Sequence, residues 1–169
     1  VDELVDYAHK NPGKLTYATN GVGSYAHLQA EAFKLRHGID LTHVPFKSLP
    51  EGSTAVMGGN VDVAIDTPFG VAARVRAGTL RGIVLFGAQR EEALPDVPTL
   101  AEAGFADPDL QPAFAGIVAP ARTPDAIADE LRQASAAVIR DADYLARLRS
   151  VGSQPLLLSS AEFAASMAR

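Results

Sequence analysis

The sequence predicts an α/β fold with a doubly wound, mostly parallel sheet flanked by helices. Segments with strand character alternate with segments of helical spacing along the first half of the chain, which is typical of βαβ units. The run GIVLFG at 82–87 is apolar throughout, as expected for a strand that is covered on both faces of a parallel sheet. The first expected strand leads through a glycine-containing loop into a helix, which predicts a crossover connection.

The first half of the chain contains the expected sheet. A helix at 2–11 stops at Asn11-Pro12-Gly13, and a β-rich run at 14–19 follows it. The next helix runs from Ser24 to His37, and its predicted apolar stripe consists of Tyr25, Leu28, Ala32 and Leu35. The remaining expected elements are strands at 41–46, 61–66 and 80–87, a helical turn before Gly58-Gly59 and a helix at 68–78.

The second half is expected to be mostly helical. Its elements are a connector at 89–112 with a short helix around 99–103, a buried strand at 114–120, an amphipathic helix at 123–139, a helical segment at 144–148 and a strand at 155–158. Ser159 and Glu162 have the spacing of a capping box, which predicts a final helix after Ser159.

Composition excludes several classes of function. The chain has 169 residues, a formal net charge of −5 and no long basic cluster, so a nucleic-acid-binding surface is not expected. No apolar stretch is long enough for a membrane span, and the first ten residues lack the apolar segment of a signal peptide. Because there is no cysteine, disulfides, thiolate catalysis and sulfur-ligated metals are excluded. We expect no cofactor.

The loop TNGVGSYAH at 19–27 is the most informative local feature. Residues 21–26 match the dinucleotide pattern G-x-G-x-x-A, but the acidic residue that this fingerprint needs after the second strand is missing at 44–47. A hydrolase using Ser24 and His27 is disfavoured because both lie on one helical turn and G-x-S-x-G is absent. No two of the four histidines have the His-x-x-x-His spacing of a metal site.

A site for a small anion is the interpretation that the backbone favours. Amides at the start of a helix have no intrahelical acceptor, and the helix dipole attracts negative charge there. We expected the amides of 23–26 to be free, and we assign ligand binding to Thr19, Gly21, Gly23, Ser24, Tyr25, Ala26 and His27. A tight turn without a ligand remains the alternative. Asp66, at the end of a strand, either binds a ligand hydroxyl or amine or caps the helix near Pro68.

Five sequence blocks occur in an order that is known from one family. They are GVGSYAHL at 21–28, THVPFK at 42–47, GGNVDVAID at 58–66, LPDVPTLAEAG at 94–104 and FAGIVAPARTP at 114–124. Over nearly the whole chain they resemble the extracytoplasmic solute receptors of tripartite tricarboxylate transporters, often called Bug proteins. LPDVPTLAEAG is the most specific block, because no general rule of folding requires its prolines, Thr99, Glu102 and Gly104 in that arrangement.

The resemblance implies a type II periplasmic binding protein, in which two α/β lobes close on a carboxylate solute. Residues 1–112 would form the second, ligand-binding lobe, and 113–169 would supply the returning strand and helices of the C-terminal part of the first lobe. The resemblance assigns the carboxylate to Gly21, Gly23, Ser24 and, as a further candidate, His27. It implies a periplasmic protein that delivers its solute to membrane permease subunits and catalyses no reaction.

The chain also departs from the family. Phe46 and Ser48 replace the usual Tyr and Gly, and Phe114 replaces the usual Trp, so the identity of the solute stays open. Family members have about three hundred residues, which suits two lobes, so we expect the N-terminal part and the export signal to be missing here. We therefore expect weak ligand binding and self-association through exposed apolar faces. A Rossmann-like oxidoreductase domain and a structural domain without a ligand are the alternatives.

Overall fold

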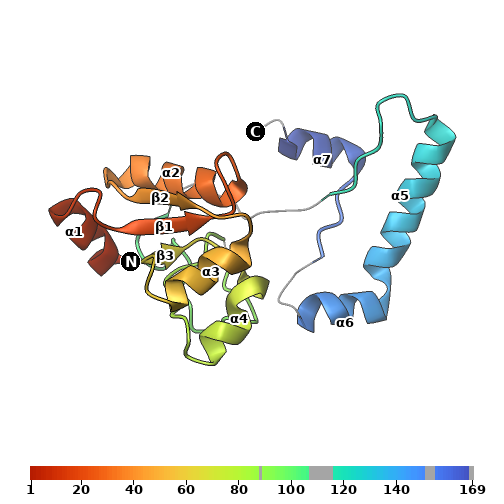
Figure 1. Cartoon of the computed structure of the whole chain (residues 1–169). Coiled ribbons are helices and arrows are strands. Elements are labelled where there is room, and N and C mark those ends of the chain that lie inside the picture. The colour runs from red at the N-terminus through yellow and green to blue at the C-terminus, as the bar shows by residue number, and fades with distance from the viewer. Residues whose placement is uncertain (88, 107–115, 151–154, 168–169) are drawn as a thin grey trace. The chain divides into compact units, whose positions relative to one another are not determined.

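A computed structural model of the chain describes residues 1–87, 89–106, 116–150 and 155–167. The chain divides into two compact units, Val1–Pro112 and Ala113–Arg169 (Figure 1). The assignment of these units to the two lobes of a binding protein stays a prediction.

The first unit is an α/β domain with a parallel sheet, as predicted. Its elements are α1 (Asp2–Lys10), β1 (Thr16–Thr19), α2 (Tyr25–His37), β2 (Thr42–Pro45), α3 (Leu49–Met57), β3 (Val63–Ala64) and α4 (Pro68–Arg76). The strand order is β2-β1-β3, and β1 pairs in parallel with both neighbours. Because successive strands are added on opposite sides of β1, the chain reverses its winding between β1 and β3, as in doubly wound sheets.

Helices cover both faces of the sheet. Tyr17 and Ala18 are neighbours on β1 and therefore point to opposite faces. The Tyr17 hydroxyl donates to Glu31 of α2, whereas the Ala18 methyl group lies 3.0 Å from the position that a Cβ would take on Gly52 of α3. Thus α2 and α3 lie on opposite faces, and Figure 1 shows them on either side of β1.

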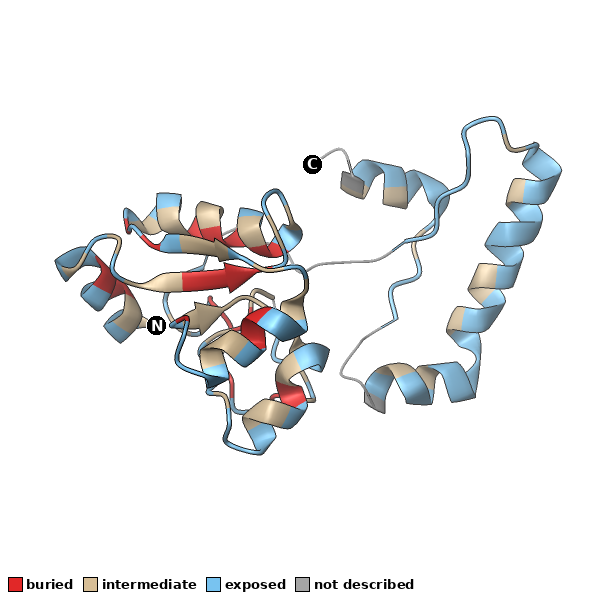
Figure 2. Ribbon diagram, viewed as in Figure 1, coloured by how far each residue is buried: buried red, intermediate tan, exposed pale blue. Residues whose placement is uncertain are grey.

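The core of the first unit lies between α1, α2 and the sheet (Figure 2). Its buried residues are Val5, Ala8, Tyr17, Ala30, Phe33, Ile39, Leu41 and Leu100. A second, smaller cluster contains Ala72, Leu85, Leu94 and Val97. Tyr17 is the largest fully buried side chain, with 1% of its surface exposed, so β1 is the centre of the packed structure.

The apolar stripe predicted for α2 is wrong for three of its four residues, whereas the fourth, Ala32, is half-buried and packs against the core. Tyr25, Leu28 and Leu35 are 41%, 58% and 83% exposed. The buried face consists instead of Ala26, Gln29, Ala30 and Phe33. Two small alanines followed by one phenylalanine let the helix backbone approach the sheet closely, whereas the apparent leucine stripe lies on the other side of the helix.

The strand predicted at 80–87 is also wrong. Only Leu85 forms a bridge, and its partner is Thr99 rather than one of the three sheet strands. The Leu85 amide donates to the Pro98 carbonyl at 2.8 Å, and the Leu100 amide donates to the Leu85 carbonyl at 3.0 Å. An apolar run needs a neighbouring strand along its whole length to form a ladder, and here the neighbour is a short loop.

The block LPDVPTLAEAG has a structural explanation that we did not anticipate. The Thr99 amide donates to the Glu102 carboxylate, and the Glu102 amide donates to the Thr99 hydroxyl, which is a capping box. The Arg90 guanidinium binds the same carboxylate and also donates to the Pro95 carbonyl at 2.9 Å. Only one helical turn follows Thr99, so the expected short helix is reduced to a turn.

The described part of the second unit contains three helices, α5 (Asp125–Arg140), α6 (Ala142–Ser150) and α7 (Ser160–Met167). The capping box of the last helix is confirmed, because Ser159 and Glu162 exchange hydrogen bonds in both directions. Residues 116–120 and 155–158 are not strands. Phe114 lies outside the described residues.

The described part of the second unit has no buried residue. The predicted apolar stripe of α5 is exposed, with Ile127, Leu131 and Val138 at 47%, 46% and 49%. Strands at 116–120 and 155–158 would need neighbours to accept and donate their backbone hydrogen bonds, and these segments are exposed except for the half-buried Leu158.

Among the described residues, none of the helices combines the length and the apolar composition required to cross a membrane.

Candidate functional site

The loop at 20–24 joins β1 to α2 at the carboxyl end of β1, beside the segment that follows β3. The amide of Ile65, directly after β3, donates to the carbonyl of Ala18 on β1. The loop and Asp66 therefore lie at the carboxyl edge of the sheet where the winding reverses between β1 and β3. In open α/β sheets this position is the usual place for a ligand.

Two glycines give the loop its shape. Gly21 and Gly23 have φ angles of +119° and +76°, a region that residues with a side chain rarely adopt. No atom lies within 4 Å of the position that a Cβ would take on either glycine. The backbone conformation, and not a lack of space, is therefore the reason that glycine is required at both positions.

The amides of Gly23 and Ser24, which we expected to be free, are engaged within the loop. The Gly23 amide donates to Nδ1 of His27 at 3.2 Å, and the Ser24 amide donates to the Gly21 carbonyl at 3.3 Å. The Gly21 amide donates to the Thr19 hydroxyl. The short loop folds back on itself and so supplies acceptors to its own donors.

Apart from the backbone and side-chain amides of Asn20, three donors on the loop and the first turn of α2 have no acceptor among the described residues. The first is the amide of Val22, a residue that is 79% exposed. The second is the hydrogen of the Ser24 hydroxyl, whose oxygen caps α2 by accepting from the His27 amide at 3.3 Å. The third is Nε2–H of His27, since Nδ1 is the acceptor for Gly23. Ala26 is 4% exposed, so its amide is little accessible to a ligand.

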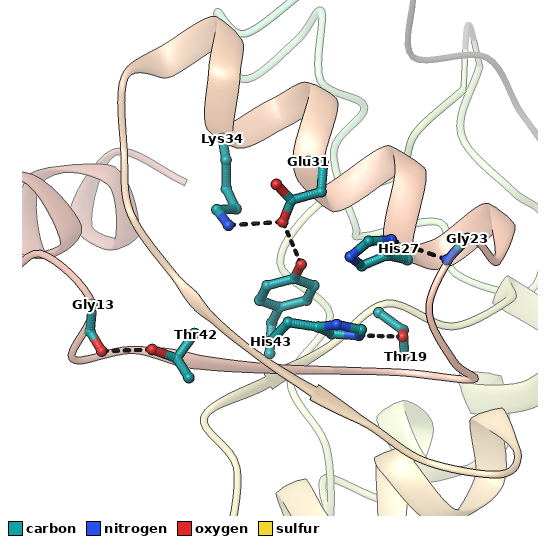
Figure 3. A network of polar contacts seen from close by, with 9 residues as sticks. Gly13, Thr19, Gly23, His27, Glu31, Lys34, Thr42 and His43 are labelled. Carbon is teal, nitrogen blue, oxygen red and sulfur yellow. Dashed lines mark hydrogen bonds and ion pairs between the residues drawn. The ribbon is translucent and has the colours of Figure 1, made fainter.

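A cluster of three aromatic rings, those of Tyr17, His27 and His43, lies beside the loop (Figure 3). Tyr17 and His43 are register partners on β1 and β2, and their ring centroids are 4.9 Å apart. The ring centroid of His27 lies 4.3 Å from that of His43. Nε2 of His43 is 2.7 Å from the hydroxyl of Thr19. Because register partners point to the same face of a sheet, both strands present these side chains to α2.

A partly buried chain of polar contacts extends from this cluster along α2. The Tyr17 hydroxyl donates to Oε1 of Glu31 at 2.5 Å, and Lys34 binds the same oxygen at 2.7 Å. Burial would raise the pKa of the Glu31 carboxyl, but hydrogen bonds from Lys34 and Tyr17 outweigh it and lower the pKa. Burial and the neighbouring Glu31 carboxylate raise the pKa of Tyr17. The carboxylate thus stays charged while the phenol stays neutral.

The pKa of His43 is lowered below its ordinary value of 6.5. Burial is the larger cause, and the proximity of His27 is the second. The folded state then binds fewer protons than the unfolded state as the pH falls from 6.5, so the first unit should lose stability in this window. We expect a lower thermal midpoint at pH 5.5 than at pH 7.5, and a smaller difference in His43→Phe. Replacement of the exposed His9 by glutamine is the control, and an equal acid effect in all three proteins would contradict the assignment to His43.

Asp66 lies at the same edge of the sheet, with both carboxylate oxygens engaged. Oδ1 accepts from the Thr67 amide at 2.7 Å, and Oδ2 accepts from the Ser53 hydroxyl at 2.6 Å. The cap of α4 is Thr67, which accepts from the Gly70 amide. Asp66 is therefore not the capping residue. Its role as a ligand contact stays a prediction.

The described first unit also has two shallow surface hollows away from the loop. One lies over α3 and includes Phe46 and Asn60, and the other lies between α1 and residues 81–83. Neither is lined by any of the predicted binding residues.

Comparison with known proteins decides the family. Residues 1–168 match the model of the tripartite tricarboxylate transporter family receptor. The chain belongs to this receptor family. A UPF0065 protein of Bordetella pertussis is 33% identical over 153 residues, which are 90% of this chain and 47% of the relative. The chain thus spans about half the length of this curated relative.

Solved structures of similar proteins bear out the predicted fold. A structure of a periplasmic transporter superposes with a TM-score of 0.88 at 33% identity, covering 99% of this chain and 55% of the other. An R. palustris protein with adipate gives a TM-score of 0.82 at 28% identity, covering 99% of this chain and 56% of the other. Both superpositions include nearly the whole chain and so bear out its α/β fold. The comparisons do not favour the alternative of a nucleotide-binding oxidoreductase domain.

Seven of the eight predicted residues lie in the continuous segment 19–27, which comprises the end of β1, the loop and the first turn of α2, and Asp66 lies at the neighbouring strand end. Sequence reasoning missed His43, although the residue stands in the family block THVPFK. The sequence signal that points to this face of the sheet is the alternation of strand side chains, which puts Tyr17 and Thr19 on one face of β1. Only the strand register adds that His43 is opposite Tyr17.

Proposed function

We propose that the protein is an extracytoplasmic receptor that captures a small organic carboxylate. It delivers this solute to the membrane permease subunits of a tripartite tricarboxylate transporter, and it acts in the periplasm. Membership of the receptor family supports the proposal, as does the related R. palustris structure with adipate.

The observation that carries the proposal is the set of donors at the carboxyl edge of the sheet. The Val22 amide, the Ser24 hydroxyl and Nε2–H of His27 belong to six consecutive residues and have no acceptor among the described residues. A carboxylate is an acceptor with two oxygens, and the positive end of the α2 dipole adds to its attraction. The site therefore suits one carboxylate group better than an uncharged ligand.

Binding without turnover agrees with the contacts of Ser24 and His27. The Ser24 oxygen accepts a bond from the His27 backbone amide, and Nδ1 of the His27 ring accepts from Gly23. Within the described chain the serine hydroxyl makes no hydrogen bond to the imidazole, so the serine lacks the adjacent base that activates a nucleophile. A nucleotide is disfavoured because β2 is followed by Phe46 and Lys47 instead of an acidic residue.

The chain contributes one half of a two-sided carboxylate clamp in this proposal. In a hinged receptor the ligand favours the closed state because both lobes donate hydrogen bonds to it. The donors on this loop would then hold a carboxylate only weakly by themselves. We expect saturable binding with a dissociation constant in the millimolar range.

A titration followed by amide NMR tests the proposal. Succinate and adipate are expected to shift the signals of Val22, Ser24 and His27 with one common midpoint, and NAD is expected to leave them unchanged. Ser24→Ala should weaken the response, because it removes one of the three donors. Ser48→Ala is the matched control, since Ser48 also precedes a helix but makes no capping bond.

Two results would contradict the proposal. A response to NAD alone would favour the nucleotide alternative. Submicromolar binding of a simple dicarboxylate would show that these residues form a complete site and not half of a clamp.

A further inference from the structure

His43 contacts both side chains that hold the glycines of the loop. Its Nε2 is 2.7 Å from the Thr19 hydroxyl, and its ring lies 4.3 Å from the ring of His27. Thr19 accepts from the Gly21 amide at 3.2 Å, and His27 accepts from the Gly23 amide at 3.2 Å. Each of the two glycines is thus tied to a side chain that touches His43.

The geometry around Thr19 makes this contact specific. Thr19 is 1% exposed, and its hydroxyl also donates toward the Gly21 carbonyl at 3.3 Å. The Thr19 hydroxyl thus binds both the amide and the carbonyl of Gly21. It can fix the conformation of Gly21 only if a further contact fixes the orientation of the hydroxyl. The shortest contact of the hydroxyl is the one to His43.

We propose that His43 is a positioning residue, which sets the conformation of the loop at 20–24 through Thr19 and His27. The effect of His43 on carboxylate binding rests on the function proposed above. Its effect on the conformation of the loop does not depend on that function. No donor of His43 needs to reach the ligand in this role.

The charges around His43 agree with a neutral supporting ring. On β1 it faces Tyr17, whose pKa is raised, and on α2 it faces His27, Glu31 and Lys34. Burial is the main cause that lowers the pKa of His43, and the proximity of His27 adds to it. A neutral His43 can lie against the tilted ring of His27 without the repulsion that two charged rings would have.

Two substitutions distinguish the contribution of Nε2 of His43 from that of its ring. His43→Phe keeps the stacked ring and removes Nε2, whereas His43→Gln removes the ring and keeps an amide nitrogen at similar reach. We expect His43→Phe to raise the amide hydrogen exchange rate of Gly21 by about 2- to 10-fold, as for the loss of one hydrogen bond, and to leave Gly23 unchanged because the ring beside His27 is kept. His43→Gln is expected to restore the rate at Gly21 and to raise the rate at Gly23, because it removes the ring.

The matched control is Thr42→Val. Thr42 precedes His43 on β2, and its hydroxyl donates to the Gly13 carbonyl at 2.9 Å. This variant therefore loses one hydrogen bond at the amino end of β2, away from the loop at 20–24. It should leave Gly21 and Gly23 unchanged. Equal exchange at Gly21 in the wild type and in His43→Phe, with both proteins folded by circular dichroism, would overturn the proposal, as would equal acceleration in Thr42→Val.

A double-mutant cycle with Thr19→Val tests the path of the effect. If His43 acts through the Thr19 hydroxyl, the Phe substitution should add little to the Gly21 exchange rate of Thr19→Val. Additive effects would overturn this path. His43→Gln again supplies a folded second variant if His43→Phe is unstable.

Succinate titration of the same proteins separates this proposal from the proposed function. We expect the midpoint to rise by about 2- to 10-fold in His43→Phe, by the same argument of one lost hydrogen bond. If the wild type does not respond to succinate, the proposed function fails for this chain. The positioning role is then still decided by the exchange rates of Gly21 and Gly23.

Discussion

Replacement of Phe33 by alanine is expected to lower the free energy of unfolding of the first unit by about 3–5 kcal/mol, the usual cost of truncating a buried phenylalanine. Phe33 is 8% exposed, and its ring centroid lies 4.5 Å from that of His37 and 6.2 Å from that of Phe105. The substitution leaves a cavity between α2 and the loop that contains Phe105. Urea unfolding, followed through the amide signals of Tyr17 and Ala30, measures the change.

Leu35→Ala on the same helix is the control. Leu35 is 83% exposed, so this variant should change stability by no more than about 0.5 kcal/mol. The pair of variants also tests which face of α2 is buried. A larger loss for Leu35→Ala than for Phe33→Ala would restore the apolar stripe that we predicted from the sequence.

We expect the chain to self-associate through α5, and Leu131→Glu to weaken this association by about 10- to 100-fold, since burial of one leucine contributes about 1.5–3 kcal/mol. The expectation rests on the exposed side chains of Ile127, Leu131 and Val138, which share one face of the helix. Stable monomers rarely expose contiguous apolar patches of this kind. Sedimentation equilibrium over a range of concentrations measures the dissociation constant.

Gln133→Glu is the matched control for α5. It introduces the same charge at an exposed position of the helix, outside the apolar stripe, and should leave the association unchanged. A strictly monomeric wild type at the highest concentration would contradict the expectation. Equal weakening by both variants would assign the effect to net charge instead of the apolar face.

Caps and breakers made the helices of the first unit predictable. Ser24 caps α2 by accepting from the His27 amide, and Gly38 ends it in the left-handed conformation, as local residue preferences require. Hydrophobic periodicity did not predict the buried face of α2, because two faces of this helix carry apolar residues. Packing against the sheet decides which of the two faces is buried. The run at 80–87 failed because a strand depends on a partner that is distant in the sequence.

The loop of the candidate site was predictable in position but not in its hydrogen bonds. The glycines and the helix start locate the loop, since positive φ angles favour glycine. That the Gly23 amide would donate to His27 depends on a side-chain rotamer, which sequence patterns do not specify. The link from Thr19 to His43 depends on the register of two parallel strands, and it became visible only with the pairing of Tyr17 and His43.

The small sheet has outer strands of four and two residues, β2 and β3. Unpaired backbone groups on an outer strand can recruit strands from other molecules and so start aggregation. Asp62, next to β3, accepts from both the amide and the hydroxyl of Thr16, which fastens the shorter strand to the centre by a side chain. Such brief outer strands offer a foreign strand only a few places to attach, so the fold limits fibril-like growth without needing charged residues along its edges.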